Sequence, residues 1–346
     1  MTPRKKLILT EKDICVLIPT YNRPRDIEKT VTSLVKEGKP AKLIILDQSV
    51  NEETKKIISK ISKNNQFVEY RHYDIRGKNI VLNYVIDELK KKYKLFFLID
   101  DDVEVVSGFF RNILNEFNSN EKVKGIGAVD LKDFEKGKNV NYESLKFKLK
   151  RLILEFMLLP HQEDHKFRIL GPYGNTSTPK IEKDIRDCQW IQGFVMCYRN
   201  EVFENYRIPD RIGYDVSEDI DLSYYVYRKY GVESLVIPLN VKVFHNYSQV
   251  ERYADKKRIF VNHEDHFNFY YRQFYNFSGT IRFLWELFWI NVLNVGRIVV
   301  KPNKTNLLKL KYFWEALGYC IKYRKEIKKG ESRMFLNEDL SMKNKF

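Results

Sequence analysis

The sequence predicts an α/β protein with a mostly parallel sheet flanked by helices. In the N-terminal part, short apolar runs alternate with helical segments, and these runs are apolar at nearly every position. Strands buried on both faces have this composition, and in parallel sheets helices cover both faces. We therefore expect ligands to bind at the carboxyl ends of these strands.

The expected elements begin with a regular strand–helix alternation. Strands are predicted at 14–19, 41–46, 67–70 and 95–99, and helices at 25–36, 52–62 and 78–92. Farther along, strands are predicted at 123–129, 189–198 and twice within 234–244, and a helix at 220–230. The stretch 133–183 has no clear period, so no element is predicted there.

The character of the chain changes after Asn246, where it becomes helical and rich in aromatic residues. We expect one domain over 1–246, with the ligand site at its sheet edge. A C-terminal helical region over 247–346 would contact a ligand, a membrane surface or a second subunit.

The apolar segment 281–300 is long enough to span a bilayer, but charged residues such as Arg282 and Glu286 interrupt it. It predicts an amphipathic helix in the membrane interface, anchored by Trp285 and Trp289. The alternative is a helix packed on the catalytic domain or on a second subunit, as in a homo-oligomer.

The net charge of +15 is compatible with nucleic acid, anionic lipid or phosphorylated small molecules as partners, or with a generally Lys-rich composition. No nucleic-acid-recognition motif is present, so we expect no nucleic-acid partner. The four cysteines form no C-x-x-C pair, which predicts free thiols in a reducing compartment. With no signal peptide expected at the N-terminus, this predicts a cytoplasmic protein, or one peripheral at the inner face of the cell membrane.

Carboxylates follow two of the predicted strands. Asp100, Asp101 and Asp102 come directly after the run LFFLI, and Asp47 ends the run LIILD. Carboxylates separated by one residue can share a hard cation such as Mg²⁺ or Mn²⁺ together with its bound phosphate. The alternatives are a solvated turn after the strand for the triplet and a turn cap for Asp47.

Asp219 lies on the inward face of its predicted helix, because Leu222 and Val226 follow it three and seven positions later. An acid that points inward suggests a functional role. The alternative is electrostatic, since Asp215 and Glu218 could form a capping box and acids favour the first turn of a helix.

Six segments together resemble the family 2 glycosyltransferases. They are VLIPTYNR, LIILDQS, RGKNIVLNYVID and FFLIDDDVE, followed by the pair WIQGFVMCYRNEVFEN and VSEDIDLSYYVYRKYG in the downstream half. The resemblance covers about residues 13–246. It implies a GT-A fold, in which a Rossmann-like sheet binds a nucleotide sugar, and an inverting transfer reaction.

The resemblance also implies roles for the matching residues. The donor would be a nucleoside-diphosphate sugar, and the acceptor a carbohydrate or lipid-linked molecule such as a polysaccharide precursor. The implied residues are Pro19, Thr20, Tyr21 and Arg23 in the nucleotide pocket, Asp47 near the base or ribose, Lys78 near the phosphates, Asp100 facing the nucleoside, Asp101 with no defined role, Asp102 and His245 as ligands of Mn²⁺ or Mg²⁺, and Asp219 as base with Glu218 beside it.

Two other functions were weighed against this one. A sugar-nucleotide pyrophosphorylase would have a Gly-rich loop after the first strand, where this chain has Thr20-Tyr21-Asn22-Arg23. A non-catalytic protein that binds nucleic acid or anionic membrane would rest on charge alone. Two His-containing clusters, His161 with His165 and His263 with His266, lack the H-E-x-x-H spacing and are predicted to be polar segments.

Overall fold

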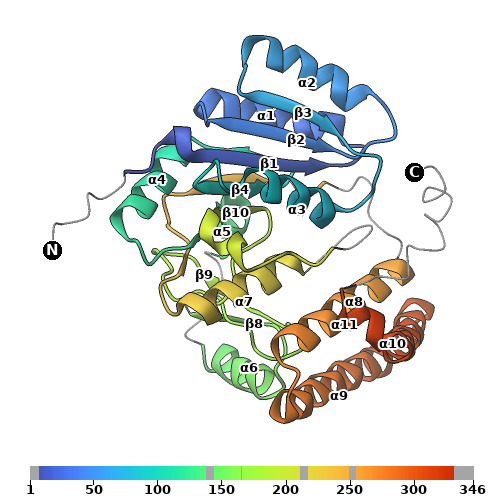
Figure 1. Ribbon diagram of the computed structural model, residues 1–346. Helices are drawn as coiled ribbons and strands as arrows, with labels where there is room; N and C mark the ends of the chain where they lie inside the picture. The colour runs from blue at the N-terminus through green and yellow to red at the C-terminus, as the bar shows by residue number, and fades with distance from the viewer. Residues whose placement is uncertain (1–7, 138–143, 165, 211–216, 249–254, 331–346) are drawn as a thin grey trace.

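The computed structural model describes residues 8–137, 144–164, 166–210, 217–248 and 255–330. Its centre is a seven-stranded sheet with the order β11-β6-β10-β4-β1-β2-β3 (Figure 1). The strands are β1 (Ile14–Thr20), β2 (Lys42–Asp47), β3 (Val68–His72), β4 (Leu95–Ile99), β6 (Gly125–Gly127), β10 (Val195–Arg199) and β11 (Leu235–Val236). All neighbouring strands in it are parallel except at β10, which is antiparallel to β4 and β6. The predicted mostly parallel sheet is confirmed.

Helices cover both faces of this sheet, so β1 and β4 are buried at every position. Side chains that alternate along β1 enter two different apolar cores. One core includes α1 (Pro24–Glu37), α2 (Glu53–Asn64) and α4 (Phe109–Ser119), and the other includes α3 (Lys78–Leu89) and α7 (Glu218–Tyr230). The first strands and helices therefore lie where the sequence predicts them.

A smaller three-stranded sheet joins distant parts of the chain at the carboxyl edge of β4. It consists of β5 (Val103–Val105), β12 (Lys242–His245) and β7 (Val129–Asp130), with β12 in the middle. The antiparallel register pairs His245 with Val103. This pairing places a histidine next to the acidic triplet, about 140 residues earlier in the chain.

The middle of the chain contains elements that its sequence did not predict. Within 133–183 lie α6 (Leu145–Phe156) and the strands β8 (His161–Asp164) and β9 (Ser177–Lys180), preceded by α5 (Leu131–Gly137). The predicted strand at 189–198 is only partly correct, because β10 starts at Val195 and the apolar residues before it form a loop. Short 3-10 helices lie at Glu11–Asp13 and Asn200–Glu204.

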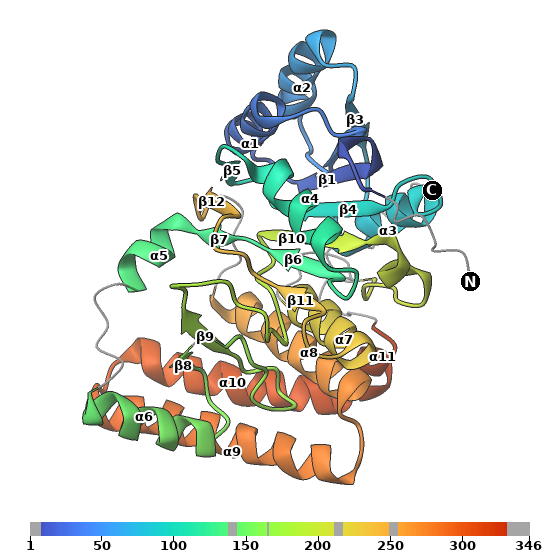
Figure 2. The same ribbon diagram turned by 90° about the vertical axis from the view of Figure 1, so that its left-hand side faces the viewer.

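The described residues 255–330 form four helices, with a core of their own below the sheet (Figures 1 and 2). They are α8 (Asp255–Gln273), α9 (Phe277–Val300), α10 (Lys304–Lys322) and α11 (Arg324–Lys328). The domain boundary predicted near residue 246 falls between β12 and α8 and stays a prediction.

The four cysteines are buried and form no disulfide. Among the described residues, α9 is long and apolar enough to cross a membrane by length and composition. Two of its charged residues, Arg282 and Glu286, however, contact the rest of the protein. Glu286 is fully buried and accepts hydrogen bonds from the Tyr173 amide at 2.6 Å and the Asn175 side chain at 3.2 Å, and Arg282 donates to the Leu170 carbonyl. One face of α9 therefore packs on the rest of the protein.

We expect the Glu286→Gln variant to gain stability over the wild type as pH increases, because the wild type becomes less stable. Burial raises the pKa of Glu286 to about 8 from an ordinary 4.5, so between these values the folded state binds more protons than the unfolded state and loses stability as pH rises. The glutamine keeps an acceptor for Tyr173 and carries no charge. Thermal melts at pH 5 and pH 8 would measure the effect, at about 2–4 °C for each kcal/mol.

Glu286→Ala is the matched control. It leaves the Tyr173 amide buried without its acceptor, so we expect a lower melting temperature at both pH values. If the melting temperature of the wild type rose relative to that of Glu286→Gln as pH increased, the result would contradict an energetic cost of burying the Glu286 charge.

Candidate active site

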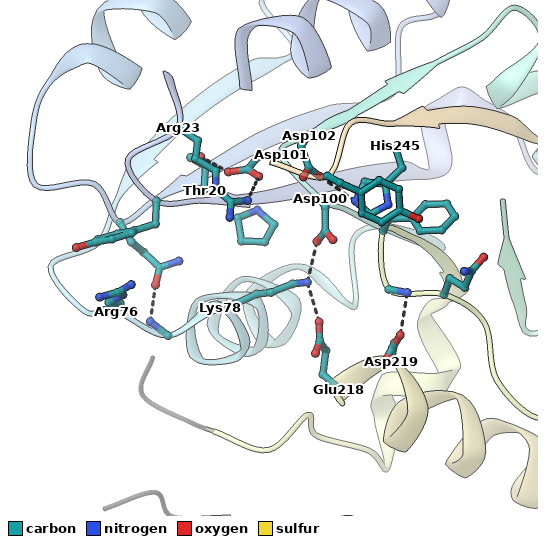
Figure 3. Close-up of a pocket in the computed structure, with 18 of the residues that line it drawn as sticks. Thr20, Arg23, Arg76, Lys78, Asp100, Asp101, Asp102, Glu218, Asp219 and His245 are labelled. Atoms are coloured by element: carbon teal, nitrogen blue, oxygen red, sulfur yellow. Dashed lines mark hydrogen bonds and ion pairs between the residues drawn. The ribbon is translucent and has the colours of Figure 1, made fainter. Parts of the chain in front are cut away.

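A cavity of about 400 Å³ opens at the carboxyl ends of β1 and β4, between them and the N-terminus of α7 (Figure 3). Every predicted site residue except Asp47 lines it. The lining residues are Pro19, Thr20, Tyr21, Arg23, Gln48, Arg76, Gly77, Lys78, Asp100, Asp101, Asp102, Trp190, Gln192, Gly193, Phe194, Glu218, Asp219, His245 and Tyr247. The structure therefore brings acids from two distant parts of the chain into one cavity.

Asp101, the middle residue of the triplet, binds the loop that follows β1. Its carboxylate accepts hydrogen bonds from Thr20 Oγ1 at 2.7 Å and from Arg23 at 2.9 Å. Thr30 in α1 donates to its backbone carbonyl at 2.7 Å. Burial raises the pKa of Asp101 to about 6, against the opposing effect of Arg23. These contacts give Asp101 a positioning role, which the resemblance had left undefined.

The other two acids of the triplet form a candidate metal site with His245. One ligand atom from each of Asp100, Asp102 and His245 lies within 4.8 Å of the others. His245 Nε2 is 3.2 Å from Asp102 Oδ1, and the Ser248 amide donates to Asp102 Oδ2 at 2.8 Å. Although burial acts to raise it, these two partners hold the pKa of Asp102 at about 2. Asp102 is therefore ionised and ready to bind a cation at neutral pH.

Two aromatic rings hold the His245 side chain in place. Its ring centre is 4.9 Å from that of Phe194 and 4.0 Å from that of Tyr247. The Tyr247 hydroxyl donates to Asp133 at 2.9 Å, which fixes the second ring. Rigid support of this kind keeps a metal ligand in one orientation.

Lys78 bridges two acids across the cavity (Figure 3). Its ammonium donates to Asp100 Oδ1 at 2.8 Å and to Glu218 Oε1 at 2.7 Å. Burial disfavours the charged ammonium, but the two carboxylates outweigh it and keep the pKa of Lys78 well above its usual value. The residue predicted to approach the phosphates thus lies in the cavity wall and joins the triplet to the start of α7.

Asp219 is held by backbone amides. Gly193 N donates to its Oδ2 at 3.0 Å and Ile220 N to its Oδ1 at 2.8 Å. Burial, and then the nearby Glu218 carboxylate, raise the pKa of Asp219 to about 8. A Cβ added at Gly193 would lie 3.2 Å from Asp219 Oδ2, so a larger residue there would press on this carboxylate. Such an acid can accept a proton near neutral pH.

The inward orientation of Asp219 agrees with the sequence argument, because Leu222 and Val226 on the same face of α7 are fully buried. The helix begins at Glu218 after Ser217, which makes no side-chain cap. Asp215, the other member of the predicted capping box, lies outside the described residues.

The opposite end of the cavity has an aromatic ring and a guanidinium. Arg76 stacks over the Tyr21 ring at 4.1 Å, and Gln48 accepts a hydrogen bond from the Gly77 amide. A stacked pair of this kind suits the flat base of a nucleotide.

Asp47 is placed differently from the prediction. It is fully buried and accepts hydrogen bonds from Tyr70 at 2.8 Å and from the Ser49 amide at 2.9 Å. Its carboxylate does not line the cavity, whereas its neighbour Gln48 does. The turn-cap alternative describes Asp47 correctly, because its side chain bonds the backbone two residues later.

Several residues that line the cavity are not among the site residues predicted from the sequence. Gln48 and Arg76 lie one and two positions from predicted site residues, and Trp190, Gln192, Gly193 and Phe194 lie in the apolar segment that was predicted to be a strand. The glycine at 193, within a segment of large side chains, was the available signal. The His-containing clusters are not part of the cavity wall. His161 and His263 lie elsewhere, and His165 lies outside the described residues.

Residues 15–170 match the family model described as Glycosyl transferase family 2. The chain is similar to S. aureus TarS 1-349 in complex with UDP-GlcNAc, at 12% identity over 90% of this chain and 81% of that chain, with a TM-score of 0.55. It is also similar to the mannosyltransferase PcManGT from Pyrobaculum calidifontis in complex with GDP-Man and Mn²⁺, at 12% identity over 90% and 75% of the two chains, with a TM-score of 0.49. None of the curated proteins compared with the chain matches its sequence.

The sheet order and the similarity to the TarS structure show a fold of the GT-A type. Residues 15–170 match glycosyltransferase family 2, so the resemblance seen in the opening segments is confirmed for that stretch. The match ends before the downstream segments that contain Trp190 and Asp219, and the roles implied for those segments stay predictions.

We expect Asp102→Asn to weaken Mn²⁺ binding by at least about tenfold, because the site loses a charged oxygen ligand. Isothermal titration calorimetry with MnCl₂ would measure it. Asp101→Asn should instead lower the melting temperature, since Asp101 binds Thr20 and Arg23, with a smaller effect on metal affinity.

Asp74→Asn is the matched control, an exposed acid outside the cavity that should bind Mn²⁺ like the wild type. Unchanged Mn²⁺ affinity in Asp102→Asn would remove Asp102 from the ligand set.

Proposed function

We propose that the protein is an inverting glycosyltransferase that moves a sugar from a nucleoside-diphosphate sugar to an acceptor hydroxyl. One observation carries the proposal: a group of side chains that could hold a metal ion and an acid of raised pKa line the same cavity at the carboxyl edge of the sheet. The first can bind a diphosphate through a cation, and the second can activate a hydroxyl.

The donor would lie along the triplet, with its base at the Tyr21 and Arg76 pair. Asp102 and His245, with Asp100 beside them, would hold Mn²⁺ or Mg²⁺, since two carboxylates and an imidazole suit either ion. When bound, the cation neutralises charge on the departing diphosphate. The TarS structure, which has a similar fold, contains UDP-GlcNAc, and a donor of that class agrees with the proposal.

The proposed reaction is a single displacement. Asp219 accepts the proton of the acceptor hydroxyl while the hydroxyl oxygen bonds to the anomeric carbon. The bond from that carbon to the phosphate oxygen breaks, and its electron pair leaves with the nucleoside diphosphate. One in-line attack inverts the anomeric centre. The Gly193 and Ile220 amides hold Asp219 in position throughout.

We further propose that the acceptor is a carbohydrate or a lipid-linked precursor of a polysaccharide. Trp190 and Phe194 line the same cavity as Asp219 and add apolar surface to its wall. The four cysteines are buried and form no disulfide, which suits a reducing compartment, so the proposed site of action is the cytoplasm or the inner face of the cell membrane.

Asp219→Asn should abolish transfer and leave donor binding unchanged. The amide cannot accept the hydroxyl proton at neutral pH, yet it has nearly the same volume as the acid. Nucleoside diphosphate release with acceptor present measures transfer, and calorimetry with the donor and Mn²⁺ measures binding. Turnover at the wild-type rate, or pyrophosphate release from sugar phosphate and nucleoside triphosphate, would rule out the mechanism.

Glu218→Gln should shift the pH profile of kcat/KM to lower pH. Asp219 is a base only when ionised, so the wild-type rate should rise with pH through about 8. The Glu218 charge raises the pKa of Asp219 and the Lys78 charge lowers it, so removing the Glu218 charge lowers this pKa. If the rising part of the kcat/KM profile of Glu218→Gln stayed at the wild-type pH or moved to higher pH, the result would contradict this coupling between Glu218 and Asp219.

A further inference from the structure

Two helices that are far apart in sequence expose apolar stripes on the same side of the molecule. On α6 the exposed residues are Leu145, Leu149, Leu152, Ile153 and Phe156. On α9 they include Phe277, Ile281, Leu284, Phe288, Val292, Val295 and Val299. Apart from Ile153, successive members are three or four positions apart, so each set forms one stripe along its helix.

The two stripes are neighbours in space. Figures 1 and 2 both show α6 beside α9 at the base of the molecule. Trp285 Nε1 on α9 donates to the Phe156 carbonyl at 2.9 Å, and the two rings meet edge to face with centres 5.2 Å apart. Two exposed apolar stripes that adjoin each other on the surface of a protein indicate an interaction site.

Basic side chains flank the α6 stripe. Lys146, Lys148 and Lys150 are exposed, and they lie to either side of the leucines on the helical wheel. With Arg151, the helix has four basic residues and one acid, Glu155. Lysines placed this way can lie at headgroup level while the stripe enters the acyl region.

We propose that the α6–α9 face docks on the surface of an anionic lipid bilayer, with both helices lying in the plane of the interface. A second copy of the chain is a poorer occupant, because it would bring the same lysines against these ones. A spanning orientation for α9 conflicts with its inner face, where buried Glu286 binds Tyr173 and Asn175. The α6–α9 face therefore suits contact with one leaflet of a bilayer.

Vesicle flotation tests the proposal. The full chain should float with vesicles of phosphatidylcholine and phosphatidylglycerol, and much less with phosphatidylcholine alone. Added salt should weaken the binding, because the lysines contribute through charge. The readout does not depend on sugar transfer, so its failure is separate from a failure of the proposed function.

The variants Leu149→Glu/Leu152→Glu and Leu284→Glu/Phe288→Glu place charges in the two stripes. Each should reduce binding to anionic vesicles by at least about tenfold, because a charge opposes insertion of the apolar face. Val50→Glu and Val232→Glu are matched controls, exposed valines outside both stripes. These sites are exposed, so melting temperatures should stay close to the wild type.

Three results would overturn the proposal. The first is no flotation with anionic vesicles. The second is flotation that survives both stripe variants. The third is a wild-type dimer, seen by light scattering, that becomes monomeric in the stripe variants while vesicle binding stays the same, since that result would assign the face to a second copy.

Discussion

The crowding of carboxylates at one cavity is the constraint on which the site depends. Five acids from two parts of the chain line it, and like charges this close cannot all be ionised without cations among them. The fold resolves this by pairing Asp101 with Arg23 and by sharing Lys78 between Asp100 and Glu218. Asp102 contacts His245, and Asp219 has backbone amides as donors. The pairing pattern thus gives the five acids different surroundings, and these differences underlie the proposed positioning, metal-binding and proton-accepting roles.

Much of the fold could be predicted from the sequence, because strands buried on both faces have a simple signature. The strands β1, β2 and β4 each contain a continuous apolar run, and the acids that follow β4 lie at the sheet edge, as a parallel sheet requires. The inward face of Asp219 could be predicted in the same way from helical spacing. Local periodicity carries this information because neighbouring residues in the sequence define it.

The remainder depends on contacts that local patterns do not encode. The apolar run before β10 is a loop because its residues line a cavity, and the spacing of apolar residues on α6 was obscured by the lysines between them. Asp47 has the same strand-end position as Asp100, yet Tyr70 from the neighbouring strand directs it into the interior. His245 reaches Asp102 because of the register between β12 and β5. The residues next to His245 in the sequence do not reveal this register.

The position of β10 has a consequence for how the enzyme is assembled. This antiparallel strand lies between β4 and β6, and it comes from beyond the stretch that matches the family. During synthesis the N-terminal half emerges without the strand that completes its sheet, and without the histidine and the aspartate contributed by later elements. Long-range pairings of this kind form slowly. A nascent or truncated chain would therefore have the Tyr21 and Arg76 end of the cavity well before it had His245 and Asp219.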